Sequence, residues 1–167
     1  RLERIRPALQ RYIDDGRIPG MATLIARHGR VIHCEAYGLM DLEAERPMTT
    51  DGIVRIYSMT KMLTAVATLQ LVERGVLQLD DAIGRWIPEL AKPQVFVGGS
   101  ADAPQLEPAE RPITVHMLLN HTAGLSYDFI TGSPVGELYR RAELWSAESL
   151  DQFVERLATL PLIAQPG

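Results

Sequence analysis

Lysine is the scarcest charged residue of this sequence. The chain has 17 basic residues, and only Lys61 and Lys92 among them are lysines. Arginine cannot act as a base because its pKa lies above about 12. A reaction step that needs a basic amine therefore has only these two lysines to draw on.

Other absences exclude whole classes of protein. A single cysteine, Cys34, rules out an internal disulfide, and its apolar surroundings predict a packed, inert thiol on a strand. No run approaches 18 consecutive apolar residues, so we expect no transmembrane helix and no membrane partner. The net charge of −4 gives no electrostatic reason to expect a nucleic-acid partner either.

What remains is the composition of an ordinary folded protein. Hydrophobic residues make up 46% and charged residues 23%, and 167 residues can form one domain with a core. The first 16 residues are charged and helical in their periodicity, which is unlike a signal peptide. This favours a cytoplasmic location, while a leader removed upstream and a periplasmic location stay open.

Hydrophobic periodicity predicts a small number of elements. An amphipathic helix is expected before Gly16, followed by two strands over 21–27 and 30–37 joined at His28-Gly29. Residues 38–52 are expected to form a loop, and the proline-rich stretch 92–112 an irregular excursion. Short helices are predicted after Thr114, ending by Gly124, and over 149–160, where Ser149 and Gln152 fit a capping box.

The most apolar predicted helix covers residues 59–72 and ends near Gly75. Its apolar residues surround the helix instead of forming a stripe, which is typical of a buried helix. With only two strands in sight, this helix would lack a sheet to cover it, since an isolated hairpin is marginal.

Ser58 and Lys61 stand at the start of that helix. Residues three apart share a helix face at about 5–6 Å between Cβ atoms, so the amine can reach the hydroxyl. Serine is a poor nucleophile unless a neighbour takes its proton. A lysine can do so when burial lowers its pKa from about 10.4, and Met59, Met62 and Leu63 are expected to supply the low-dielectric surroundings.

The alternative interpretation makes Ser58 a helix cap and Lys61 a solvated side chain. Two observations favour chemistry. The one Ser-x-x-Lys match falls at the start of the one helix that looks buried, and a buried cation without a role is costly. The chain also uses lysine here although it otherwise relies on arginine. We therefore expect Ser58 and Lys61 to be catalytic.

Three blocks then carry a family resemblance: "YSMTK" at 57–61, "LVERGVLQLDDAIGRWIPEL" at 71–90 and "ITVHMLLNHTAGL" at 113–125. Together they resemble the serine β-lactamase/penicillin-binding-protein superfamily, in its class C-like branch, and most of all the family VIII carboxylesterases. The similarity covers most of the chain and is weakest over 92–112. It implies an α+β fold, with an antiparallel sheet, flanking helices and a helical region.

The resemblance also implies roles. Ser58 would be the acylated nucleophile, Lys61 its proton partner, and the backbone N–H of Ser58 the first donor of an oxyanion hole. Tyr127, in the loop after "HTAG", would lie at the rim of the substrate cleft and contact substrate; ordinary loop packing is the alternative. The four histidines show no ligand spacing, so we expect no metal and no other cofactor. Turn or surface positions are expected for them, with His121 fixing the local backbone.

Two elements of that family are not found in the sequence. Its Tyr-x-Asn or Tyr-Ser-x segment follows a Pro-Gly, and the sequence ends at Pro166-Gly167. Its Lys-Thr-Gly or His-x-Gly strand is missing too. Residues 1–167 are thus expected to be the N-terminal part of a single domain and catalytically incomplete alone. The remainder would be absent, disordered, or a partner in the form of a separate segment.

These observations predict a serine hydrolase that works through an acyl-enzyme, with a small-molecule ester or a β-lactam as substrate. A carboxylesterase of small esters is favoured. A class C-like β-lactamase or a D-Ala-D-Ala carboxypeptidase shares the acylation step and stays open. So does a non-catalytic binding relative that keeps the fold.

Overall fold

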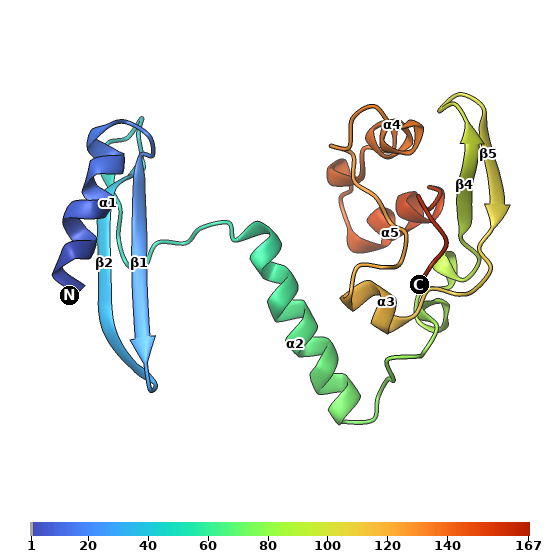
Figure 1. Cartoon of the computed structure of the whole chain (residues 1–167), viewed down its shortest axis with the longest axis horizontal. Coiled ribbons are helices and arrows are strands. Elements are labelled where there is room, and N and C mark those ends of the chain that lie inside the picture. The colour runs from blue at the N-terminus through green and yellow to red at the C-terminus, as the bar shows by residue number, and fades with distance from the viewer. Residues whose placement is uncertain (1) are drawn as a thin grey trace. The chain divides into compact units, whose positions relative to one another are not determined.

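The computed structural model describes residues 2–167, and the chain forms two compact units. The first unit ends at Tyr57, and the second covers Ser58–Gly167. Each is described by itself (Figure 1).

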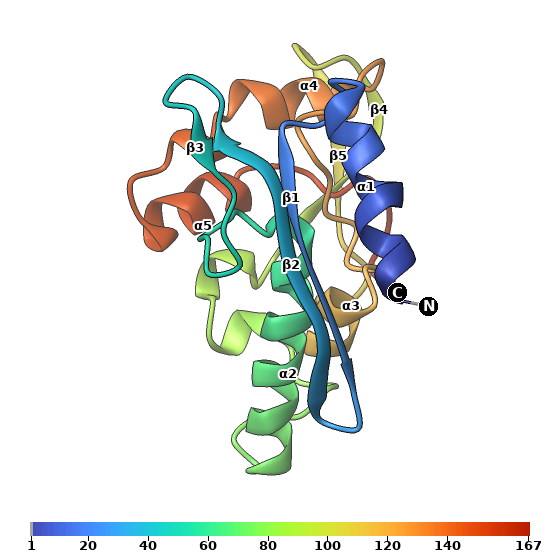
Figure 2. The ribbon, with the colours of Figure 1, turned by 90° about the vertical axis from the view of Figure 1, so that its left-hand side faces the viewer.

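The first unit is a helix on a hairpin. The short 3₁₀ turn η1 (Leu2–Arg4) leads into α1 (Ile5–Asp14), and β1 (Gly20–Arg27) pairs antiparallel with β2 (Arg30–Asp41). His28 and Gly29 have φ angles of 50° and 73°, the left-handed pair that a tight two-residue hairpin turn requires. The predicted helix, hairpin and turn are confirmed, while β2 continues to Asp41 and pairs with a short β3 (Arg46–Pro47) inside the expected loop (Figure 2).

One face of the hairpin packs on α1. Arg6 of α1 pairs with Glu35 at 3.0 Å and lies over the Tyr37 ring, and His33 and Tyr37 on this face are buried. Cys34 points to the opposite face and is exposed, because side chains alternate along a strand. The predictions of a packed Cys34 and of a turn or surface position for His33 are therefore wrong.

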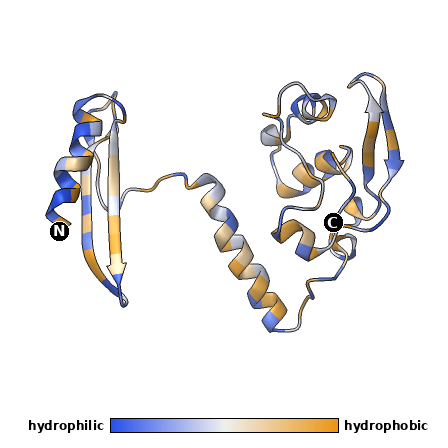
Figure 3. Cartoon of the chain, in the orientation of Figure 1, coloured by the Kyte–Doolittle hydropathy of each residue, from blue (hydrophilic) through white to orange (hydrophobic). Residues whose placement is uncertain are grey.

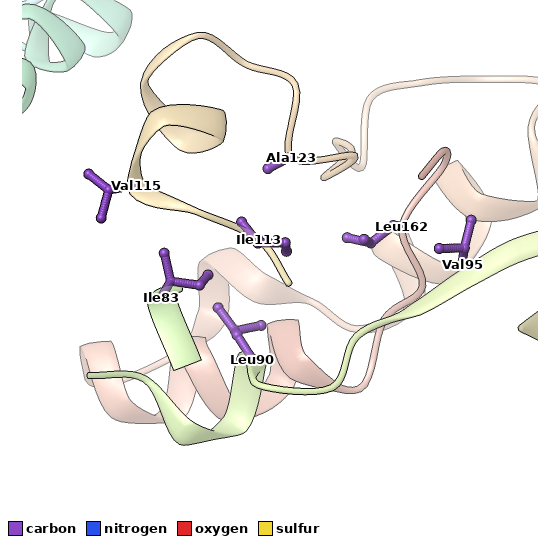
Figure 4. Close-up of a cluster of buried hydrophobic side chains, with 7 residues drawn as sticks. All are labelled: Ile83, Leu90, Val95, Ile113, Val115, Ala123 and Leu162. Atoms are coloured by element: carbon purple, nitrogen blue, oxygen red, sulfur yellow. The ribbon is translucent and has the colours of Figure 1, made fainter. Parts of the chain in front are cut away.

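The second unit starts at Ser58, inside the 3₁₀ turn η2 (Tyr57–Met59), and continues with α2 (Thr60–Glu73). Two hydrophobic clusters hold the rest of it together. One consists of Ile83, Leu90, Val95, Ile113, Val115, Ala123 and Leu162 (Figure 4), and the other of Val135, Tyr139, Leu144 and Leu160. The remaining elements are η3 (Ile83–Arg85), η4 (Pro88–Leu90), β4 (Gln94–Gly99), β5 (Pro104–Pro108), α3 (Val115–Leu119), α4 (Pro134–Arg141), η5 (Leu144–Ser146) and α5 (Leu150–Ala158).

The prediction of an irregular segment over 92–112 is wrong, because β4 and β5 form an antiparallel hairpin there. The prolines of β5 were the reason for this wrong prediction. Phe96 donates its N–H to Leu162 O, away from β5, so Leu106 opposite it is a position whose N–H points away from β4. Pro104 and Pro108 lie two residues before and two residues after Leu106, so their backbone nitrogens also point away from β4. The N–H groups that these prolines lack would therefore make no hydrogen bond to β4.

The bounds of α2 were predicted closely, but its burial was not. No residue of α2 is buried among the described residues 2–167, and Met62, Leu63 and Val66 are more than half exposed. Apolar residues are spread around the helix in its sequence, and Figure 3 shows them along the side of α2 that faces the viewer. Such a pattern predicts that a helix is suited to burial, but it does not say which segment covers it, and no other element of the second unit does.

The other helices follow their capping residues. Thr114 Oγ1 accepts a hydrogen bond from the Met117 N–H, and Ser149 Oγ accepts one from the Gln152 N–H, so both predicted N-caps are confirmed. α4 was not predicted, although Pro134 at its first turn is a start signal. The α+β class with antiparallel strands is confirmed. Within residues 2–167, no helix has the length and apolarity needed to cross a membrane.

Candidate active site

Ser58 and Lys61 form the chemical centre of the candidate site. The Lys61 ammonium or amine Nζ donates a hydrogen bond to Ser58 Oγ over 3.1 Å, so the predicted proximity is confirmed. Ser58 lies in η2, and the cap of α2 is Met59, which makes no side-chain capping bond. The hydroxyl of Ser58 thus engages Lys61, and the interpretation of Ser58 as a helix cap is wrong.

The surroundings of this pair differ from the expectation. Lys61 and its neighbours Met59, Met62 and Leu63 are exposed among the described residues, so these residues do not supply the low-dielectric surroundings that the sequence predicted. Immediately before Ser58, Tyr57 has a φ of 45°. A left-handed conformation is strained for a residue with a Cβ and concentrates at functional sites.

A pocket of about 650 Å³ includes Ser58 and Lys61 in its lining. Most of its other lining residues are apolar or aromatic, and the polar ones are few, as in small-molecule sites. The rest of the lining consists of Met117, Leu118, His121, Ala123, Leu125, Ser126, Tyr127, Asp128, Leu144, Trp145, Phe153 and Leu157.

The "NHTAG" turn supplies one wall of the pocket. Thr122 donates from both its N–H and its hydroxyl to Asn120 Oδ1, and His121 between them has a φ of 64°. Backbone bonds tie this turn to the end of the chain, from Ile163 N–H to Gly124 O and from Gly167 N–H to Thr122 O. His121 lines the pocket, a placement that its spacing in the sequence did not predict.

Tyr127 lies in the lining of the same pocket as Ser58 and Lys61. Its ring stacks on Phe129 with centroids 4.7 Å apart. The structure thus brings the three predicted site residues to one pocket, and contact of Tyr127 with substrate stays a prediction.

Sequence reasoning missed two aromatic residues of the pocket lining. These are Trp145 and Phe153, with ring centroids 5.9 Å apart. Phe153 lies within the helix that was predicted over 149–160, so the sequence indicated a helical residue there but not a pocket residue. Trp145 lies in a short 3₁₀ turn, for which no periodic signal exists.

A metal site is not formed by the described part of the chain. Within residues 2–167, no group of three or more His, Cys, Asp or Glu side chains could hold a metal ion. His33 accepts or donates a hydrogen bond at 2.7 Å with Thr23 Oγ1 and lies 3.9 Å from Glu35, which accounts for its polar atoms inside the first unit.

The hydroxyl–lysine pair, the adjoining pocket and the α+β architecture together define a protein class. The chain matches the Beta-lactamase family over residues 5–167, and it belongs to that family. The resemblance to β-lactamases and penicillin-binding proteins is therefore confirmed.

Named relatives agree with this assignment. Esterase EstB from Burkholderia gladioli is 36% identical, covering 98% of this chain and 40% of its own length. Protein Rv1367c from Mycobacterium tuberculosis is also 36% identical, over 96% of this chain and 39% of its own length. The solved structure of EstCE1, a hydrolase with promiscuous acyltransferase activity, superposes with a TM-score of 0.79 at 34% identity, covering 98% of this chain and 41% of that one. The chain thus spans about two fifths of the length of these relatives.

Proposed function

We propose that this chain carries the acylation centre of a serine hydrolase, most specifically a carboxylesterase of small esters. The observation that carries the proposal is the 3.1 Å hydrogen bond between Lys61 Nζ and Ser58 Oγ at the edge of a largely apolar pocket. A nucleophile within hydrogen-bond reach of its base is the geometry that covalent catalysis needs.

The reaction has two stages. Neutral Lys61 takes the proton of the Ser58 hydroxyl while Oγ attacks the ester carbonyl carbon, and a tetrahedral intermediate forms. Its bond to the alcohol oxygen then breaks, and the proton on Lys61 passes to that oxygen, so the alcohol leaves and Ser58 is acylated. Water attacks the acyl-enzyme in the second stage, which releases the carboxylic acid and restores the hydroxyl.

The charge that develops on the carbonyl oxygen needs donors. Ser58 lies in the turn that opens α2, and the free N–H groups and dipole at a helix start favour negative charge. The backbone N–H of Ser58 is the first oxyanion donor in this proposal. The second donor and the cover of α2 would come from the rest of a single domain of which residues 1–167 form the N-terminal part.

An ester is preferred over a β-lactam because of the relatives. EstB is named an esterase and EstCE1 a hydrolase with acyltransferase activity, and both names describe chemistry that passes through acyl transfer. The acylation step is the same for a β-lactam, so the two substrates differ in how fast the acyl-enzyme is hydrolysed. That difference can be measured directly.

The test is the intact mass of the natural full-length protein after exposure to a fluorophosphonate. We expect one adduct, located at Ser58 by peptide mapping, and none in Ser58→Ala. Ser133→Ala is the matched control, because Ser133 makes no side-chain capping bond at α4, and it should label like the wild type. An adduct that persists in Ser58→Ala would refute the proposal. A parallel incubation with a penicillin separates a stable acyl-enzyme, expected of an esterase, from rapid turnover by a β-lactamase.

A further inference from the structure

We infer that Trp145 and Phe153 form a subsite for a ring-sized apolar group of the substrate ester. This inference rests on the proposed function, because it assigns a specificity to the pocket that contains Ser58 and Lys61. Both aromatic rings line that pocket, together with Leu144 and Leu157.

The exposure of Trp145 is the first observation. Trp145 is 71% exposed although it lines a pocket, and a tryptophan left in water forgoes a large amount of apolar burial. Trp86 offers a comparison within the same unit. It is 43% exposed and carries the Arg85 guanidinium over its ring at 5.1 Å, so one of its faces is occupied by the protein itself.

The turn that carries Trp145 is held firmly in place. Arg156 of α5 donates from Nη1 to Glu143 O at 2.7 Å and to Ser146 Oγ at 2.8 Å. Leu144, the residue before Trp145, is buried in the cluster with Val135, Tyr139 and Leu160. The backbone on both sides of Trp145 is therefore anchored, which limits the entropy that a ligand must remove from it.

Backbone strain marks the same turn. Glu143, at its start, has φ and ψ of 48° and 48°, and this left-handed conformation is strained for a residue with a Cβ. The Ser146 N–H and hydroxyl both donate to Glu143 O, which helps to keep the turn in this form. Strain that the surroundings enforce at a pocket wall is typical of functional positions.

The chemistry of the wall defines what it selects. The two rings lie 5.9 Å apart at 53° to each other, and aromatic rings prefer tilted or offset partners over this range of distances. Two tilted rings with two leucine side chains beside them favour a flat or branched hydrocarbon group and offer no charge to a polar one. We therefore expect preference for esters that carry a phenyl-sized group.

The experiment compares esters that differ only by a ring, using the natural full-length protein. Methyl phenylacetate against methyl acetate reports a ring on the acyl side, and benzyl acetate against methyl acetate reports a ring on the alcohol side. In Trp145→Ala, we expect the ratio of kcat/KM values for the ring-bearing and the ring-free ester to fall about tenfold in one of the two series, which equals about 1.4 kcal/mol. Trp145→Phe should recover most of the ratio, and Trp86→Ala should leave both ratios unchanged.

Ratios that stay within about twofold of the wild type in both series of Trp145→Ala would overturn the subsite. If Trp145→Ala does not fold, Trp145→Phe answers the question with methyl naphthylacetate in place of the phenyl ester. The smaller ring should then reduce the preference for the naphthyl group, and an unchanged preference would count against the inference.

A binding measurement separates this inference from the proposed function. The Ser58→Ala protein should still bind 2-naphthol, and Trp145→Ala in that background should weaken binding about tenfold. If Ser58→Ala still hydrolyses esters while naphthol binding depends on Trp145, the proposed function fails and the subsite stands. If hydrolysis needs Ser58 but neither selectivity nor naphthol binding depends on Trp145, the subsite fails and the proposed function stands.

Discussion

Lys61 Nζ and Ser58 Oγ lie 3.1 Å apart, one helical turn from each other, with the amine as donor. In the reverse role, as proton acceptor, only a neutral lysine can serve. We predict that Lys61→Arg, which keeps the positive charge but cannot lose its proton, slows fluorophosphonate labelling of Ser58 by at least about 10²-fold.

Lys92→Arg provides the matched control, because it makes the same exchange at the other lysine of the chain. Lys92 lies outside the pocket that contains Ser58, so labelling should proceed at the wild-type rate. A Lys61→Arg protein that labels within about threefold of the wild type would refute the role of Lys61 as base.

Gly124 allows the close approach between the "NHTAG" turn and the end of the chain. Its φ is +80°, and a Cβ built on it would lie 2.4 Å from Ala164 O. We predict that Gly124→Ala lowers the free energy of unfolding by about 3 kcal/mol, from left-handed strain together with overpacking. The midpoint of urea unfolding measures this loss.

Gly132 separates the two causes. Its φ is +75° but a Cβ would meet nothing within 4 Å, so Gly132→Ala should cost only the strain, about 1 kcal/mol. Equal losses for the two variants would contradict the steric part of the argument.

Tyr139 has a fully buried ring, and its hydroxyl has no well-aligned hydrogen-bond partner among residues 2–167. Burial raises the pKa of the Tyr139 phenol, and the backbone of Ser126 partly offsets this. No backbone or side-chain group within residues 2–167 makes a full hydrogen bond to this hydroxyl. Removal of an unsatisfied buried hydroxyl relieves a desolvation cost, so Tyr139→Phe should be neutral or stabilising in the same urea measurement.

Tyr37→Phe is the comparison. The Tyr37 hydroxyl donates to Glu35 Oε2 at 2.8 Å, and its loss should destabilise the protein by about 1 kcal/mol. A larger loss in Tyr139→Phe than in Tyr37→Phe would show that the hydroxyl of Tyr139 is satisfied after all.

Glu35 links stability to pH. The hydrogen bond from Tyr37 lowers the pKa of Glu35 below its ordinary value, with further lowering from the charge of Arg6, although desolvation opposes both. A carboxyl whose folded pKa is depressed adds stability above its unfolded pKa, and this stability is lost as pH falls through the folded value. The difference in Tm between wild type and Glu35→Gln should therefore be constant from pH 7 down to about pH 4.5. Below that pH the difference should shrink towards zero.

Glu43→Gln makes the same exchange at a carboxylate that enters none of the ion pairs found among residues 2–167. Its Tm difference from the wild type should stay flat with pH. A Glu35→Gln difference that is equally flat would contradict the assigned pKa shift.

Local signals in the sequence predicted the elements that depend on local chemistry. The His28-Gly29 turn, the Thr114 and Ser149 caps and the span of α2 all follow from backbone conformation or from a side chain three residues away. The meeting of Ser58 with Lys61 belongs to the same group, because a helix alone sets that distance.

The predictions that were wrong concern features that depend on neighbours distant in sequence. Which face of β2 packs on α1 decides that His33 is buried and Cys34 exposed, and nothing local distinguishes the two faces. The turn that places Trp145 in the pocket lining is held by a hydrogen bond from Arg156 to Glu143 O and by the left-handed conformation of Glu143. Neither feature produces a periodic pattern in the sequence. The burial of α2 is a third example, because its apolar surface indicates burial but does not identify the segment that covers it.

The prolines of β5 have one more consequence. β4 is flanked on one side by β5 and on the other by a bridge from Val95 to Leu162, whereas β5 is an end strand of its two-stranded sheet. An open strand edge is a template on which another molecule can add its own strand. Pro104 and Pro108 remove hydrogen-bond donors from that edge. The two prolines that led to the wrong prediction for this hairpin therefore also protect it against aggregation.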